Sequence, residues 1–203
     1  MKKYIFLFFL MNIIVLSFAQ NFSFEEPDVP ADWTVTGGDA LSVSAEHFKD
    51  GSQSLCWTTN GNNSLKVTFT SFLTSTSNGS RLQIYSPAAT NDTLIVEHYS
   101  ALNLLRRKAN YLLNYKGWRD FNRKYTEFSN SNSSQDIVSV KFTLKPATSG
   151  TRKIYFDKVD FNATVAADRV IGNQWVLDKT WFAGNTEPLT INNFNRDIPV
   201  VSA

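Results

Sequence analysis

Short runs in which hydrophobic and polar residues alternate occupy most of the chain after its first 20 residues. Gly, Asn, Asp and Ser separate these runs at fairly even spacing, and residues 77–80 (SNGS) are one of the turns predicted from them. Alternation with a period of two predicts strands with one buried face and one solvated face, as in antiparallel sheets. Many short strands joined by such turns predict an all-β fold, an antiparallel β-sandwich or barrel. The alternating runs are residues 34–36, 41–43, 54–57, 64–69, 81–85, 93–97, 138–144 and 153–156.

Residues 101–115 (ALNLLRRKANYLLNY) depart from this pattern. Leu104, Leu105, Lys108 and Leu112 are close to the spacing of one helix face, which is compatible with a short amphipathic helix. The same stretch is compatible with a β-hairpin whose tip is formed by residues 106–110. The strand-like flanks favour the hairpin, and the sequence leaves both alternatives open.

The N-terminus has the pattern of a signal peptide. Lys2 and Lys3 precede an apolar run over residues 4–16, and small residues at Ser17 and Ala19 predict cleavage after Ala19. The apolar run is shorter than the roughly 20 residues that a membrane-spanning helix requires. We therefore expect a secreted or periplasmic protein, with residues 1–19 removed and no membrane span in the mature chain.

Signal cleavage changes the charge balance. The whole chain has 20 Lys and Arg against 18 Asp and Glu, and the signal peptide contains two of these lysines and no acidic residue. The mature chain is therefore formally neutral, so an anionic partner must be recognised by a local cluster, and nucleic acid is disfavoured. About 180 residues suit one domain. Cys56 is the only cysteine, which excludes an intrachain disulfide, and its Leu-Cys-Trp context predicts a buried thiol.

Complete catalytic motifs are missing from the sequence. It contains no nucleophile elbow, phosphate-binding loop, dinucleotide fingerprint or HExxH motif. His47 and His98 are the only histidines and lie in unrelated contexts. The sequence therefore identifies no catalytic residue.

The densest group of cations lies between residues 106 and 124, interleaved with aromatic residues. Cations recognise sulfate and carboxylate groups, and aromatic rings pack on sugar faces, so this pattern predicts an anionic-polysaccharide surface. The alternative is a solvated hairpin tip beside a core tryptophan, and for Trp118 itself the core is the favoured location. The predicted sugar-binding residues are Arg106, Arg107, Lys108, Tyr111, Lys116 and Arg119.

Ordered landmarks carry a resemblance to a known family. Phe24-Glu25, the turn at residues 47–55 and the strand at residues 154–161 resemble jelly-roll carbohydrate-binding modules of the galactose-binding-like fold. Gly117-Trp118-Arg119, residues 136–142, Lys145-Pro146 and Tyr155-Phe156-Asp157 narrow the match, because they resemble the N-terminal domain of the chondroitin sulfate ABC lyases. The resemblance covers residues 22–199, with a departure at residues 81–86.

The resemblance implies a jelly-roll β-sandwich over residues 20–165, followed by a linker segment over residues 166–203. It also implies a structural Ca²⁺ held by Glu25, Asp157 and the carbonyl groups of Lys49 and Gly51, and calcium accepts such oxygen ligands.

In this family the catalytic residues belong to later domains, so the resemblance implies a non-catalytic module, a truncated or detached part of a glycosaminoglycan lyase. Its partner would be chondroitin sulfate, a related glycosaminoglycan or a catalytic lyase domain. The alternative is a structural domain that packs on a partner domain and binds no sugar.

Overall fold

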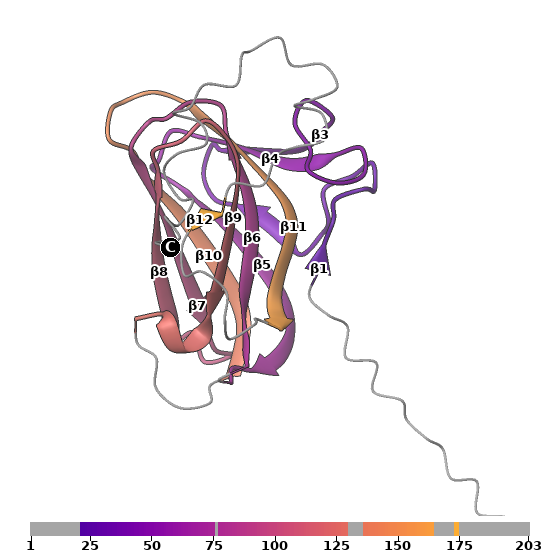
Figure 1. Cartoon of the computed structure of the whole chain (residues 1–203), viewed down its shortest axis with the longest axis vertical. Coiled ribbons are helices and arrows are strands. Elements are labelled where there is room, and N and C mark those ends of the chain that lie inside the picture. The colour runs from indigo at the N-terminus through magenta and orange to yellow at the C-terminus, as the bar shows by residue number, and fades with distance from the viewer. Residues whose placement is uncertain (1–20, 76, 130–135, 165–172, 175–203) are drawn as a thin grey trace, which may run out of the picture.

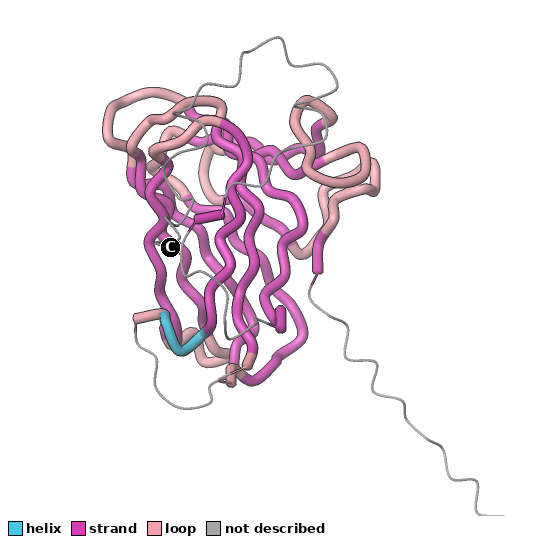
Figure 2. Tube along the Cα trace, viewed as in Figure 1, coloured by secondary structure: helices cyan, strands magenta, loops and turns pink. Residues whose placement is uncertain are grey.

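Strands make up almost all the regular structure in the computed structural model, which describes residues 21–75, 77–129, 136–164 and 173–174. A single 3₁₀ turn, η1 (Tyr125–Glu127), is the one helical element within these ranges (Figure 2). The strands are β1 (Asn21–Phe22), β2 (Trp33–Val35), β3 (Ala40–Ser44), β4 (Ser54–Thr59), β5 (Ser64–Leu73), β6 (Asn78–Ser86), β7 (Asp92–Tyr99), β8 (Leu105–Leu113), β9 (Gly117–Lys124), β10 (Asp136–Lys145), β11 (Arg152–Thr164) and β12 (Asn173–Gln174).

The strands form two sheets that pack face to face (Figure 1). The seven-stranded sheet has the order β12-β9-β6-β11-β4-β3, and β1 pairs separately with β11. The five-stranded sheet has the order β2-β5-β10-β7-β8. All of these pairings are antiparallel. The predicted all-β, antiparallel β-sandwich jelly roll is confirmed.

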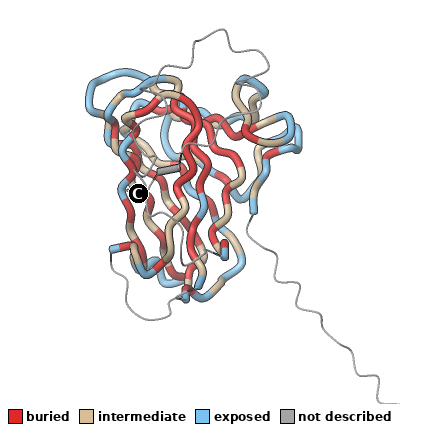
Figure 3. Tube along the Cα trace, viewed as in Figure 1, coloured by how far each residue is buried: buried red, intermediate tan, exposed pale blue. Residues whose placement is uncertain are grey.

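Aromatic side chains from both sheets fill the space between them. Trp33 of β2 contacts several of these rings, with its ring centroid 5.3 Å from that of Phe24 and 6.0 Å from that of Phe142. Phe156 and Phe161 of β11 approach the same indole from the other sheet. Figure 3 shows the resulting alternation of buried and more exposed positions along the strands. A core of this size supports the fold without a disulfide, and Cys56 is buried as predicted.

Residues 101–115 contain a strand, so the helical alternative is wrong. β8 pairs with β7 from Leu105 to Leu113, and residues 100–104 form the turn between the two strands. Asn103 adopts a positive φ of 57° there, and its amide donates to the carbonyl of Ser100. The prediction that residues 106–110 form a hairpin tip is also wrong, because these residues lie inside the strand. β7 provides partners for residues 107–110, and Arg106 lies at an irregularity in the pairing between Leu105 and Arg107.

A second difference concerns residues 77–80, which the sequence predicts as a turn. β6 already begins at Asn78, and Gly79 pairs with Lys124 of β9. A Cβ atom on Gly79 would lie 2.1 Å from the carbonyl oxygen of Arg123. Glycine is required here because the two backbones approach closely, and its role is not to form a turn.

The predicted boundaries remain predictions, since residues 1–20 and most of 166–203 lie outside the described residues. β11 continues to Thr164, close to the expected end of the sandwich. β12 nevertheless adds two residues of the expected linker segment to the edge of the seven-stranded sheet. Within the described ranges, no helix has the length and apolar character needed to cross a bilayer.

Candidate functional site

Charged side chains form a row across the outer face of the five-stranded sheet. Lys66 of β5, Lys141 of β10, Glu97 of β7 and Lys108 of β8 are direct cross-strand neighbours in that order. Neighbouring strands lie about 4.8 Å apart, so the row crosses four strands at nearly constant height. Residues of one strand alternate between the two faces, and all four of these side chains point away from the core. We call these four residues the charged row.

Glu97 connects the members of the charged row. Its Oε1 atom lies 3.2 Å from Nζ of Lys108, and its Oε2 atom lies 3.0 Å from Nζ of Lys141. The hydroxyl of Tyr99 donates to the same Oε2 atom at 3.0 Å. Partial burial raises the pKa of the Glu97 carboxyl, but hydrogen bonds from Lys141, Lys108 and Tyr99 outweigh it and leave the pKa below its ordinary value. Glu97 is therefore ionised at neutral pH.

Tyr99 provides an aromatic ring next to the charged row. It lies two residues after Glu97 on the same face of β7, and the Lys141 ammonium is 5.5 Å from its ring centroid. Arg106 lies on the same outward side of β8, where its Nη2 atom is 3.4 Å from Oδ1 of Asp136. The outer face thus combines cations and a partly exposed aromatic ring, the groups that bind acidic sugars, with the carboxylates of Glu97 and Asp136.

The structure separates the predicted sugar-binding residues into three that are partly exposed and three that are buried. Arg106 and Lys108 lie on this face, and Lys116 is half-buried in the connection between β8 and β9. Arg107, Tyr111 and Arg119 are buried, with exposed fractions of 3%, 4% and 2%. These six residues therefore do not form one continuous surface, because alternation along β8 and β9 turns three of the side chains inward. The alternative of a solvated hairpin tip is wrong for the same reason. Whether Arg106, Lys108 and Lys116 contact sugar stays a prediction.

The inward cations pack against aromatic rings between the sheets. The Arg119 guanidinium lies 4.7 Å from the ring centroid of Tyr115, and the Arg123 guanidinium lies 5.4 Å from that of Tyr111. Tyr111 belongs to β8 and Arg123 to β9, so the second contact joins the two sheets at their edges. Cation–π packing therefore explains why arginine and tyrosine residues occur together in this stretch. Trp118 is buried, as favoured from the sequence, in a cluster on the outer face of the seven-stranded sheet.

The sequence interpretation missed Lys66, Glu97, Tyr99 and Lys141. Three of them lie in runs whose alternation was recognised, and the outward position of each follows from that alternation. Their proximity depends on the strand order β5-β10-β7-β8, which joins residues far apart in the sequence. Alternation alone carries no information on that order.

The residues of the expected calcium site do come together. Oδ2 of Asp157 accepts the backbone amides of Lys49 at 2.7 Å and Asp50 at 2.9 Å, and Oδ1 accepts the amide of Lys158. Oε2 of Glu25 accepts both the amide and the hydroxyl of Ser52 at 2.9 Å. The two carboxylates thus hold the 49–52 turn from either side, which is a structural role that does not depend on a metal.

The chemistry of this turn also fits a calcium ion. Burial raises the pKa of Asp157 to about 6, and the nearby negative charge of Glu25 adds to that increase. A divalent cation between the carboxylates would stabilise both ionised forms. Gly51 has a φ of +68°, and a Cβ atom there would lie 2.1 Å from Oε1 of Glu25. The described residues contain no group of three His, Cys, Asp or Glu side chains suited to a metal, so carbonyl groups and water would have to complete the coordination.

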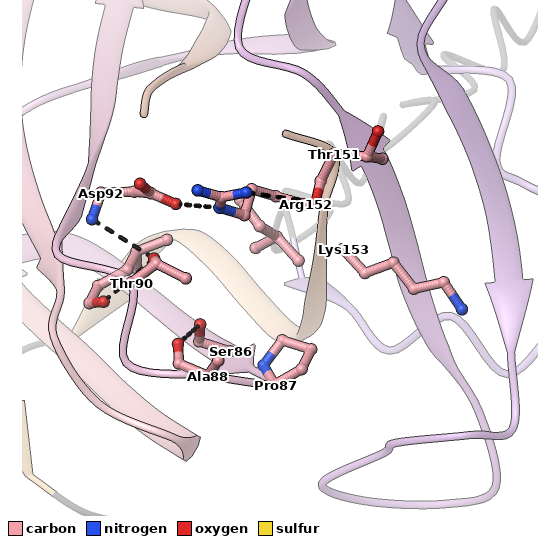
Figure 4. Close-up of a pocket in the computed structure, with 10 residues that line it drawn as sticks. Ser86, Pro87, Ala88, Thr90, Asp92, Thr151, Arg152 and Lys153 are labelled. Atoms are coloured by element: carbon pink, nitrogen blue, oxygen red, sulfur yellow. Dashed lines mark hydrogen bonds and ion pairs between the residues drawn. The ribbon is translucent and has the colours of Figure 1, made fainter. Parts of the chain in front are cut away.

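A cavity of about 240 Å³ lies at one end of the sandwich (Figure 4). Asp92 and Arg152 form an ion pair in its wall, with 2.7 Å between Oδ2 and Nε. The other oxygen of Asp92 accepts the amide of Ala147 at 2.7 Å, and Arg152 also donates to Thr148. Aromatic residues do not line this cavity and its charges are already paired, so it is a weaker candidate for sugar binding than the charged row.

Comparisons with known proteins agree with this architecture. The sequence profile of the family described as "Lyase, N terminal" matches residues 18–177. No match was found among curated proteins. A family 11 carbohydrate-binding module from Clostridium thermocellum, in complex with a β-1,3-1,4-mixed-linked tetrasaccharide, has a similar structure, with a TM-score of 0.51 and 12% identity over 71% of this chain and 95% of that one.

Longer enzymes contain a similar domain. The arabinose-bound MgGH51 α-L-arabinofuranosidase matches with a TM-score of 0.52 and 14% identity, over 77% of this chain and 28% of that one. An exo-β-agarase matches with a TM-score of 0.51 and 8% identity, over 72% of this chain and 25% of that one. This chain therefore corresponds to about a quarter of each of these two enzymes. At such identities the likeness establishes the fold.

Proposed function

Because the chain belongs to the family of lyase N-terminal domains, we propose that it is the non-catalytic carbohydrate-binding module of an exported glycosaminoglycan lyase. Its ligand would be an acidic polysaccharide, either chondroitin sulfate or a related glycosaminoglycan. The binding surface would be the outer face of the five-stranded sheet, around the charged row and Tyr99. The proposal also includes cleavage of the signal peptide and a structural Ca²⁺ at the 49–52 turn.

The observation that carries this proposal is the charged row with its adjacent ring. Three lysines from three different strands lie on one rigid face, and Lys108 and Lys141 are each 37% exposed. An ammonium group has three N–H donors, so each lysine that contacts Glu97 retains donors for a sulfate or carboxylate. The Tyr99 ring provides an apolar surface for the hydrophobic face of a sugar. Strands hold these groups more rigidly than loops do.

Charge-matched variants test this assignment. The Lys108→Ala/Lys141→Ala variant should lose tenfold or more in affinity for chondroitin sulfate, since a hydrogen bond between charged groups contributes roughly 1.5–3 kcal/mol. The control is Arg81→Ala/Lys153→Ala, which removes two half-exposed cations from the outer face of the seven-stranded sheet. We expect the control to bind within about twofold of the wild type, as remote surface charges are screened. Affinity electrophoresis or calorimetry measures both variants.

The role of the ring is tested at the same site. Tyr99→Ala removes the ring and should weaken binding, whereas Tyr99→Phe keeps the ring and loses the contacts of the hydroxyl with Glu97 and Lys141. If the wild type shows no affinity for any acidic polysaccharide, the proposed function is wrong.

A second candidate function is supported by one observation. Leu73, Leu102 and Leu104 are exposed to 64%, 78% and 49% and lie at the same end of the five-stranded sheet. An exposed apolar patch suits contact with a partner domain. A structural domain that packs through this end and binds no sugar would give no retention on chondroitin sulfate, and Leu102→Asp/Leu104→Asp would weaken its association with a catalytic lyase domain.

A further inference from the structure

We infer that Glu97 determines which polysaccharides bind to the outer face of the five-stranded sheet. It favours acidic polysaccharides in which uncharged sugars separate the anionic groups. Unsulfated chondroitin, in which a uronic acid alternates with an uncharged amino sugar, would be favoured over chondroitin sulfate, in which the amino sugar carries a sulfate. Heparin, which is sulfated on both sugars, would be disfavoured most. This inference rests on the proposed function and deepens it, because it concerns which acidic polymer the face selects.

The position of Glu97 is the basis for the inference. Its carboxylate lies between two lysines of the charged row and contacts one of them with each oxygen, at 3.2 Å and 3.0 Å. The side chain is only 13% exposed, while both lysines are 37% exposed. The two ammonium groups originate on strands that are not adjacent, and the shared carboxylate holds them on either side of itself. Glu97 therefore acts as a positioning residue for both cations.

The same carboxylate sets the charge pattern that a ligand meets. Across the sheet the charged row presents two positive positions (Lys66 and Lys141), then the negative Glu97, then the positive Lys108. An anionic group can approach the lysines at either side of Glu97. A second anion placed above Glu97 itself would meet a like charge, which is strongly unfavourable when solvent is excluded.

This pattern matches a polymer in which acidic and uncharged sugars alternate. The uncharged sugar can lie over Glu97, where its hydroxyl groups can donate to the carboxylate. The acidic sugars on either side then reach Lys108 and the Lys66–Lys141 pair. A chain with an anionic group on every sugar, such as chondroitin sulfate or heparin, places an anion over Glu97 in every register. Specificity thus arises from a repulsive element within an otherwise attractive surface.

Selectivity between polymers tests the inference directly. The affinities of the wild type, Glu97→Gln and Glu26→Gln are measured for unsulfated chondroitin, chondroitin sulfate and heparin at one ionic strength. Glu97→Gln retains the shape and the hydrogen bond from Tyr99 but removes the negative charge, so the ratio of heparin affinity to chondroitin affinity should rise about tenfold. Glu26→Gln, an exposed carboxylate elsewhere, makes the same change in net charge and should leave the ratio unchanged.

Glu97→Asp provides the second variant, since it keeps the charge and should retain the wild-type ratio even if it lowers all affinities. The inference is overturned if Glu97→Gln and Glu26→Gln change the ratio equally, or if Glu97→Gln weakens all three polymers by the same factor. Either result leaves the proposed function intact as long as the wild type binds. Failure of the wild type to bind any of the three polymers rejects the proposed function, and the inference with it.

Discussion

Arg152 of β11 donates from Nε to Oδ2 of Asp92 on β7 over 2.7 Å, and this ion pair joins the two sheets at one end of the sandwich. Asp92 is 1% exposed and also accepts the amide of Ala147. A carboxylate in this position stabilises the fold only while its partner is present, because an unpaired buried charge is strongly unfavourable.

We therefore expect Arg152→Met to lower the free energy of unfolding by about 3 kcal/mol. The matched control is Lys153→Met, whose ion pair with Glu46 is half-exposed and should contribute less than about 1 kcal/mol. Urea denaturation of both variants measures the difference. Equal losses would show that the Asp92–Arg152 pair is not a significant link between the sheets.

His98 gives the fold a specific pH dependence. The ring is fully buried against Tyr125 and Phe128, and burial together with the charge of Arg107 lowers its pKa to about 3. The unfolded chain takes up a proton on this histidine near pH 6.5, and the folded chain does not. Stability contributed by His98 is therefore present above pH 6.5 and is lost as the pH falls toward 3.

Between pH 6.5 and 5.0 the free energy of unfolding should fall by about 2 kcal/mol because of His98. His98→Phe, which keeps an aromatic ring in the cluster, should lose that part of the pH dependence. The raised pKa of Asp157 makes the fold more stable as the pH falls from about 6 to 4, which opposes the effect of His98. The wild type and the His98→Phe variant share this effect of Asp157. The comparison of wild type and variant by urea denaturation at each pH isolates His98, and parallel curves would contradict the prediction.

Calcium should stabilise the 49–52 turn if the proposed site is occupied. Free Ca²⁺ at 100 times its dissociation constant should raise the free energy of unfolding by about 2.7 kcal/mol, and a chelator should reverse the effect. Glu25→Gln should abolish the response, whereas Glu26→Gln, one residue further along, should retain it. Thermal unfolding with calcium and with chelator provides the measurement. Identical melting temperatures for the wild type in both conditions would reject the site.

Gly79 should tolerate no side chain, since a Cβ atom would collide with the carbonyl of Arg123 and separate β6 from β9. We expect Gly79→Ala to lower the free energy of unfolding by about 1–3 kcal/mol. Gly38→Ala is the control, because no atom lies within 4 Å of the added methyl group there. Its effect should stay within about 0.5 kcal/mol. Similar denaturation midpoints for the two variants would contradict the close approach.

The sequence was sufficient to predict the fold class, because alternation along most strands directly reflects one buried face and one solvated face. The prediction was wrong at Arg107, where the rule that arginine side chains are exposed to solvent does not hold. Arg107 shares the inward positions of β8 with Ala109, Tyr111 and Leu113, so the alternation was present, but a stretch containing Arg106, Arg107 and Lys108 favours a solvated turn.

The candidate site was predictable only in part. Arg106 and Lys108 were found from local charge density. Glu97 and Lys141 are 44 residues apart in the numbering and meet only because β10 lies beside β7. Such pairings are set by the packing of the whole sandwich, so a cluster drawn from separate strands leaves no local signal.

The strand order has a consequence for how the chain acquires this structure. β10 lies between β5 and β7, and β11 lies between β4 and β6, so one strand near the centre of each sheet comes late in the chain. Until residues 136–164 are available, β5 and β7 lack their shared neighbour, as do β4 and β6. Such long-range pairing predicts slow folding that is completed late and cooperatively, with unpaired strand edges exposed in the meantime. A protein ending before β11 should therefore aggregate and should not form half a sandwich.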